Sequence, residues 1–266
     1  MLLKNIILNN GLLKKAELNG VIFEDFSIEF SDKFSFFTLT EKPRFIISEL
    51  IKSEVQTNFS SALYSIQTIQ GHFELEVSTT IDISNNFIDI EAELKCLKDV
   101  YIQDFVVRMK AKKNNIKNVL IKNLNIKHQD SQKYYQFNTD NLTINSTENK
   151  KIKINRIENT KLDGVENHMY VRDLKEFWII HSRLFPSKKP KQYNLRWISN
   201  YFWVSLNFRI SKIISCLPFI GKTLWYRKER LGKKALEIQL IGLIKILKNE
   251  KIKQKVRIKY NQNDNF

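Results

Sequence analysis

Glycine, proline and cysteine are scarce in this sequence. Only 7 of the 266 residues are glycine, 4 are proline and 2 are cysteine. Phosphate-cradling loops need closely spaced glycines, and neither a P-loop nor a Rossmann glycine motif is present. The two cysteines, Cys96 and Cys216, stand far apart in unlike contexts, which is typical of reduced thiols and not of a disulfide framework. These absences argue against nucleotide-binding loops and against a disulfide-stapled secreted scaffold.

Long uncharged apolar runs are missing too. No stretch reaches the roughly 18 apolar residues of a membrane-spanning helix, and the start, MLLKNIILNN, lacks the apolar core of a signal peptide. Cys/His metal spacings and a nucleophile elbow are also not found. We therefore expect a cytoplasmic protein without a cofactor or a metal ion, and the sequence leaves open whether it is an enzyme.

Positive charge is abundant and unevenly distributed. The formal net charge is +16, yet residues 1–105 carry 9 Lys or Arg against 16 Asp or Glu, and residues 106–266 carry 35 against 12. The richness in lysine, isoleucine and asparagine is typical of an AT-rich genome, but such a bias does not explain the asymmetry. The asymmetry indicates either an anionic partner for the second half or packing of the two halves on each other.

Alternation of apolar and polar residues predicts β-strands as far as residue 185. In FELEVSTTIDISNNFIDIEAEL (73–94) the alternation runs on both sides of Asn85-Asn86, and Asn10-Gly11 and Asn19-Gly20 predict two more tight turns. We expect an antiparallel β-sandwich domain over residues 1–186, with one helical or mixed segment at 43–56. The alternative is a parallel β-helix, because NVLIKNLNIK (118–127) resembles NLTINSTENK (141–150).

Residues 187–266 are predicted to form a basic, aromatic-rich helical appendage. Apolar stripes at helical spacing run over 196–221, and leucines recur at i, i+4, i+7 and i+11 over 232–250. Basic amphipathic helices contact anionic membrane surfaces, pack on their own domain or a protein partner, or bind nucleic acid. We expect no nucleic-acid partner, because no recognition motif is present. The expected membrane contacts are Trp197, Trp203, Trp225, Tyr226, Arg227 and Lys228.

The stretch HMYVRDLKEFWIIHSR (168–183) predicts a hairpin closed by residues 173–176. In that register His168 lies opposite His181, and Glu166 lies opposite Arg183. One face would carry core residues such as Met169 and Trp178. The other face would gather the candidate ligand-binding residues Glu166, His168, Tyr170, Arg172, His181 and Arg183.

This polar face has four interpretations. Two imidazoles and a carboxylate could hold a divalent metal or perform acid–base chemistry. Tyrosine, arginine and histidine could bind a sugar or an anion. The remaining interpretation is a solvated sheet face with an ordinary cross-strand ion pair.

A second face, over residues 74–93, is strongly acidic. The turn at Asn85-Asn86 would place Asp82 opposite Asp89, with glutamates alongside. Like charges across strands are destabilising. We therefore expect either a solvated face or a cationic cover, which could be a calcium ion, a neighbouring lysine or the basic C-terminal segment.

The strand succession FELEVSTTIDISNNFIDIEAELKCLKDVYIQDFVVRMK (73–110) and the later WIIHSRLFP (178–186) resemble the galactose mutarotase-like super-sandwich, over about residues 20–185. The resemblance implies carbohydrate binding or processing. By residue type alone, it makes His168, His181 and Glu166 candidates for that family's catalytic histidines and glutamate. Our first hypothesis is recognition of a glycan or glycolipid at the inner membrane surface, in cell-envelope polysaccharide metabolism. The second is a non-catalytic assembly protein whose basic helices dock a partner or its own acidic face.

Overall fold

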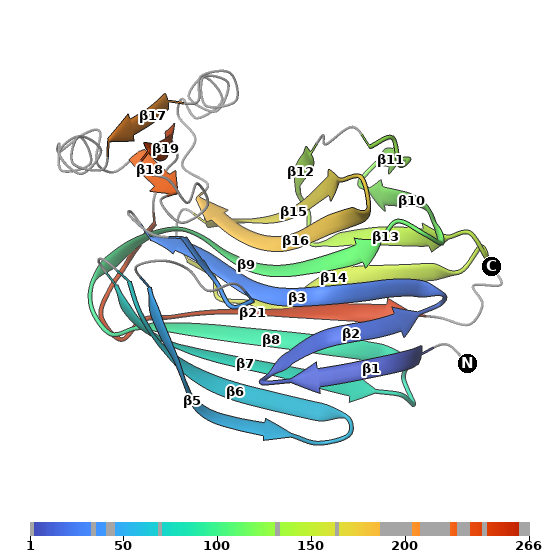
Figure 1. The fold of residues 1–266 in the computed structure, drawn as a ribbon, viewed down its shortest axis with the longest axis horizontal. Coiled ribbons are helices and arrows are strands. Elements are labelled where there is room, and N and C mark those ends of the chain that lie inside the picture. Colours follow the sequence, from blue (N-terminus) through green and yellow to red (C-terminus); the bar gives the residue numbers. More distant parts are fainter. Residues whose placement is uncertain are drawn as a thin grey trace.

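The computed structural model describes residues 3–32, 36–40, 46–68, 71–130, 134–162, 165–186, 204–207, 224–227, 235–240 and 244–260. These residues form strands joined by turns, and every strand pairing is antiparallel. Two nine-stranded sheets and one three-stranded sheet result (Figure 1). The prediction of an antiparallel sandwich is confirmed, and the parallel β-helix alternative is wrong.

The first sheet has the order β1-β2-β3-β9-β16-β15-β12, with β4 pairing β3 and β20 pairing β9. Its two opening turns are those that Asn10-Gly11 and Asn19-Gly20 predicted. All four residues have positive φ, as a two-residue hairpin loop requires. The strands are β1 (Leu3–Asn9), β2 (Leu12–Leu18), β3 (Val21–Asp32), β4 (Phe36–Thr38), β9 (Val100–Lys112), β12 (Tyr134–Asn138), β15 (Val165–Asp173), β16 (Phe177–Pro186) and β20 (Ile244–Ile246).

The second sheet has the order β11-β10-β13-β14-β21-β8-β7-β6-β5. β21, near the end of the sequence and drawn in red in Figure 1, runs between β14 and β8. The strands are β5 (Ile47–Val55), β6 (Phe59–Gln67), β7 (His72–Asp82), β8 (Phe87–Cys96), β10 (Ile116–Ile121), β11 (Leu124–Ile126), β13 (Asn141–Ser146), β14 (Lys151–Asn159) and β21 (Lys251–Tyr260).

The core lies between the two large sheets. Alternate residues of each strand point inward, and these side chains form one buried cluster that includes Phe30, Met109 and Trp178 of the first sheet. The ring of Phe30 lies 4.8 Å from that of Phe73 in the second sheet. The opposite side of the first sheet, here called its outer face, carries the polar residues of interest.

The predicted helical appendage is wrong in the part of the chain that the structure describes. Strands β17 (Val204–Asn207), β18 (Leu224–Arg227) and β19 (Ala235–Leu240) form the third sheet, in the order β17-β19-β18, and β20 and β21 complete the two large sheets. An interval of four residues, such as Leu236 to Leu240, puts side chains on one face of either a helix or a strand. The spacing therefore did not distinguish the two. The predicted helical or mixed segment at 43–56 is likewise the strand β5.

Candidate functional site

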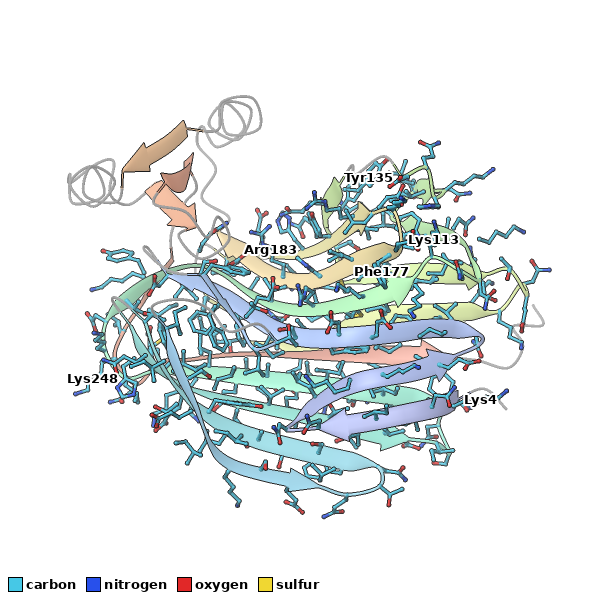
Figure 2. All side chains as sticks on the ribbon, in the orientation of Figure 1. Lys4, Lys113, Tyr135, Phe177, Arg183 and Lys248 are labelled. Carbon is cyan, nitrogen blue, oxygen red and sulfur yellow. The ribbon has the colours of Figure 1, made fainter. Side chains whose placement is uncertain are left out.

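A chain of hydrogen-bonded polar side chains crosses the outer face of the first sheet. Arg183 of β16 donates to Asp104 of β9, with Nε 2.9 Å from Oδ2, and its Nη1 lies 3.4 Å from Oε1 of Gln136 on β12. The amide nitrogen of Gln136 lies 2.9 Å from Nδ1 of His168, and Nε2 of His168 lies 2.9 Å from Glu166 Oε2. The β15–β16 hairpin and the more distant strands β9 and β12 thus contribute to one network; Arg183 is labelled in Figure 2.

The chemistry of arginine fixes the direction of each hydrogen bond in this chain. A guanidinium can only donate, so the Gln136 oxygen accepts and its NH₂ group donates to Nδ1 of His168. The proton of the imidazole then resides on Nε2, which donates to the Glu166 carboxylate. The His168 side chain is only 5% exposed. The network therefore holds His168 in one tautomer and one orientation.

Beside this chain, the rings of Tyr170 and His181 stack on each other. Their centroids are 4.7 Å apart with an interplanar angle of 23°, because Tyr170 of β15 lies directly opposite His181 of β16. Both residues are half-buried, as is Arg172 on the same face. The stack offers an aromatic surface bordered by polar hydrogen-bonding groups.

A buried ion pair continues the face toward β3. Arg108 of β9 lies opposite His181, and its Nη1 is 3.2 Å from Oε1 of Glu29. Its Nη2 also donates to the Thr40 hydroxyl at 3.0 Å. The Arg108 and Glu29 side chains are 7% and 4% exposed, so the charges compensate each other away from water. Further along β9, the hydrogen bond from Lys110 lowers the pKa of Asp25.

The structure brings all six predicted ligand-binding residues onto one face, although the predicted hairpin register is wrong by two residues. His168 faces Arg183, and the two histidines are not directly opposite. Asp173 belongs to the strand, because its carboxylate accepts from His128 and from the Gln129 amide, and the loop shortens to Lys175-Glu176. A shift of two residues preserves the faces, since side chains alternate with a period of two.

Sequence reasoning missed Asp104, Gln136, Arg108 and Glu29. A signal for two of them was present: Asp104 and Arg108 are isolated charges, four residues apart, within an otherwise mostly apolar strand. That spacing places both on the same face. Gln136 and Glu29 carry no such signal, because their place depends on which strands become neighbours.

The acidic side chains of the second sheet lie beside basic side chains of β21, the strand that pairs with β8 in the same sheet. Lys253 lies 2.8 Å from Glu91, and Arg257 donates to both oxygens of Asp89 at 2.7 and 2.8 Å. Asp82 is not opposite Asp89 as predicted; it faces Phe87 and closes a longer turn by accepting hydrogen bonds from Ser84 and Asn85. Of the predicted cations, the structure shows the basic C-terminal segment and a neighbouring lysine, Lys95, which lies 2.8 Å from Glu74.

The predicted membrane contacts fall largely beyond the described ranges. Trp197, Trp203 and Lys228 lie outside them, and Trp225, Tyr226 and Arg227 belong to the backbone of β18. Among the described residues, no helix is long and apolar enough to cross a membrane. The expected contact with an anionic membrane and the cytoplasmic location stay predictions. In the same part of the chain, no group of three or more His, Cys, Asp or Glu side chains could hold a metal ion.

Comparison with solved structures shows the fold. A galactose mutarotase-like protein from Clostridium acetobutylicum superposes with a TM-score of 0.50 and 9% identity, over 96% of this chain and 91% of that one. The chain has a galactose mutarotase-like fold. Two further structures are similar: the Slr1438 protein from Synechocystis (TM-score 0.46, 12% identity, 98% and 93% covered) and a galactose mutarotase related enzyme from Lactobacillus acidophilus (0.44, 8%, 98% and 98%). No protein-family profile and no curated protein matches the sequence.

Proposed function

We propose that this galactose mutarotase-like protein binds a carbohydrate on the outer face of its first sheet. The observation that carries the proposal is the Tyr170–His181 stack beside the hydrogen-bonded chain from Asp104 to Glu166. A sugar ring has an apolar face of C–H groups and a rim of hydroxyls. An aromatic surface suits the first, and fixed donors and acceptors suit the second.

The gradation of exposure across this face supports a binding role. The members that organise the network, Asp104 and His168, are nearly buried, whereas Tyr170 and His181 are half-exposed. A ligand would meet the aromatic stack and the edges of Arg172 and Glu166, and the buried groups would keep those side chains in place. Preorganised polar groups of this kind lower the entropy cost of binding.

Saturation-transfer NMR against a panel of neutral and acidic monosaccharides tests the proposal. Tyr170→Ala removes the aromatic surface and is expected to abolish the saturation signal of any sugar that the native protein binds. Tyr101→Ala, at another half-buried tyrosine of the first sheet, is the matched control and should leave the signal unchanged. Binding that survives Tyr170→Ala would place the sugar elsewhere, and no binding to any sugar of the panel, or to oligosaccharides built from them, would overturn the proposal.

A further inference from the structure

Strand β5 is a long, exposed edge strand in the part of the chain that the structure describes. It ends the second sheet, as Figure 1 shows at its lower margin, and among the described strands it pairs with β6 alone. All nine of its residues are exposed, and four of them are large and apolar: Ile47, Leu50, Ile51 and Val55. Native edge strands are usually short, charged, interrupted by proline or covered, because exposed backbone groups recruit another strand.

The inner side of β5 is also uncovered, because the second sheet extends past the first at this edge. A groove of about 610 Å³ opens between β5 and the turn that joins β1 to β2, and Ser48, Leu50 and Tyr64 line it. Long exposed apolar edges of this kind are sites of strand addition by a further chain.

A bulge in β5 gives this edge an unusual charge pattern. Leu50 pairs with Tyr64 and Lys52 pairs with Leu63, so Ile51 is the extra residue. Glu49 pairs with Ser65, which is two residues from Leu63 on β6. Glu49 and Lys52 therefore lie on the same face of the sheet although they are an odd number of residues apart. Without the bulge they would point to opposite faces.

We propose that two copies of the chain associate through β5, antiparallel about a two-fold axis between residues 50 and 51. In this register Glu49 of each copy lies opposite Lys52 of the other, twice per dimer. Ser48 then faces Ser53 and Ile47 faces Glu54, and in each of these pairs both residues share a face. Two-fold symmetry is the commonest arrangement of homo-oligomers and requires such a self-complementary patch.

Neighbouring registers either place like charges opposite each other or pair residues that lie on opposite faces of the sheet. Moving one copy by two residues in one direction sets Glu49 against Glu54, a like-charge pair. Moving it in the other direction sets Glu49, on the outer side, against Leu50, on the inner side. A one-residue shift mismatches the faces along the strand. Among the registers that overlap six or more residues of β5, only the Glu49–Lys52 register satisfies both conditions.

Sedimentation velocity on the full chain, over micromolar to millimolar concentrations, tests the proposal. The native protein is expected to show a monomer–dimer equilibrium. Glu49→Lys or Lys52→Glu alone should weaken dimerisation roughly tenfold or more, because each change turns two attractive pairs into repulsive ones. The double variant Glu49→Lys/Lys52→Glu should restore it, because the pairs re-form with exchanged signs.

Glu54→Lys is the matched control, since it makes the same charge change on the same strand but faces Ile47 in the proposed register. It should weaken dimerisation clearly less than Glu49→Lys. All three side chains are exposed, so the variants are expected to fold, and circular dichroism checks this. A native protein that is monomeric throughout, a dimer insensitive to the single reversals, or a double variant that stays monomeric would each overturn the proposal. Association of a different protein with this edge would leave the pure chain monomeric.

Discussion

Arg156, on β14 of the second sheet, donates from Nη2 to the backbone carbonyl of His168 on β15 of the first sheet at 3.2 Å. The same nitrogen lies 3.1 Å from the carbonyl of Arg183, and Nε lies 3.1 Å from the Ser182 hydroxyl. Arg156 thus holds β15 and β16 together from the core side by hydrogen bonds. The outer side of the same two strands carries the candidate site. The Ser182 hydroxyl donates to the side-chain oxygen of Gln254 on β21, and the Gln254 amide nitrogen donates to the Phe105 carbonyl.

Replacing Arg156 should therefore lower the free energy of unfolding substantially. Arg156→Met leaves the Ser182 hydroxyl and two backbone carbonyls without their donor inside the sandwich, and we expect unfolding free energy to fall by about 3–5 kcal/mol. Arg257→Met removes an arginine whose side chain is 33% exposed, and it should cost less, because Lys255 remains within 3.5 Å of the Asp89 carboxylate. Urea unfolding of both variants measures the difference; equal losses would show that Arg156 has no special structural role.

The raised pKa of the Tyr64 hydroxyl predicts that the protein loses stability at alkaline pH. Burial raises the pKa of Tyr64 to about 12, from 10.0, and its hydroxyl donates to the Asn10 carbonyl at 3.0 Å. The folded state therefore keeps a proton that the unfolded state releases. The contribution is fully present below pH 10 and is lost as the pH rises through about 12.

Tyr64→Phe removes the ionisable group. We expect the variant to be less stable at pH 8 by about 1 kcal/mol, through the lost hydrogen bond, and to show a flatter stability profile between pH 10 and 12. Unfolding free energies measured across this range test the prediction. A variant with the same slope as the native protein would show that another group titrates.

The pairing of β21 with the acidic strands predicts a salt-dependent stability. Lys255→Glu would place a third negative charge beside Asp89 and Glu91, which Lys255 now approaches within 3.5 and 3.3 Å. We expect a loss of about 1–2 kcal/mol at low ionic strength that shrinks in concentrated salt. Lys259→Glu, opposite the uncharged Phe87, is the control and should cost less.

Gly11 and Gly20 occupy equivalent turn positions but should tolerate alanine differently. Both have φ near +80°, which strains any other residue by about 1 kcal/mol. A Cβ at Gly11 would also lie 2.5 Å from the Val77 carbonyl oxygen, whereas at Gly20 it would meet only the Glu148 side chain at 3.4 Å. Thermal unfolding should therefore show a clearly larger loss for Gly11→Ala than for Gly20→Ala.

Local patterns determined the strands and their faces. The alternation in residues 73–94 and the two Asn-Gly turns were correct, because side-chain direction along a strand has a period of two and because asparagine and glycine accept positive φ. The same period explains why two wrong registers still gave correct faces. The six candidate residues of the β15–β16 hairpin were grouped correctly for this reason.

Local sequence patterns did not predict which distant segments pair with each other. Residues 251–260 alternate as a strand should, with Ile252, Val256 and Ile258 buried, but 232–250 was read as a helix that left little room for a final strand. The pairing of β21 with β8 and β14 depends on complementary charges and apolar side chains in segments that are more than 90 residues apart.

The sequence by itself thus determined most of the strands before residue 186, the two Asn-Gly turns, the facing of the hairpin and the charge asymmetry. Only the tertiary structure decided where β21 inserts and which strands supply Asp104 and Gln136 to the candidate site. It also decided that Arg156 supports that site from beneath. These features arise when long-range pairing brings buried polar groups together, because each such group must find its partner somewhere in the fold.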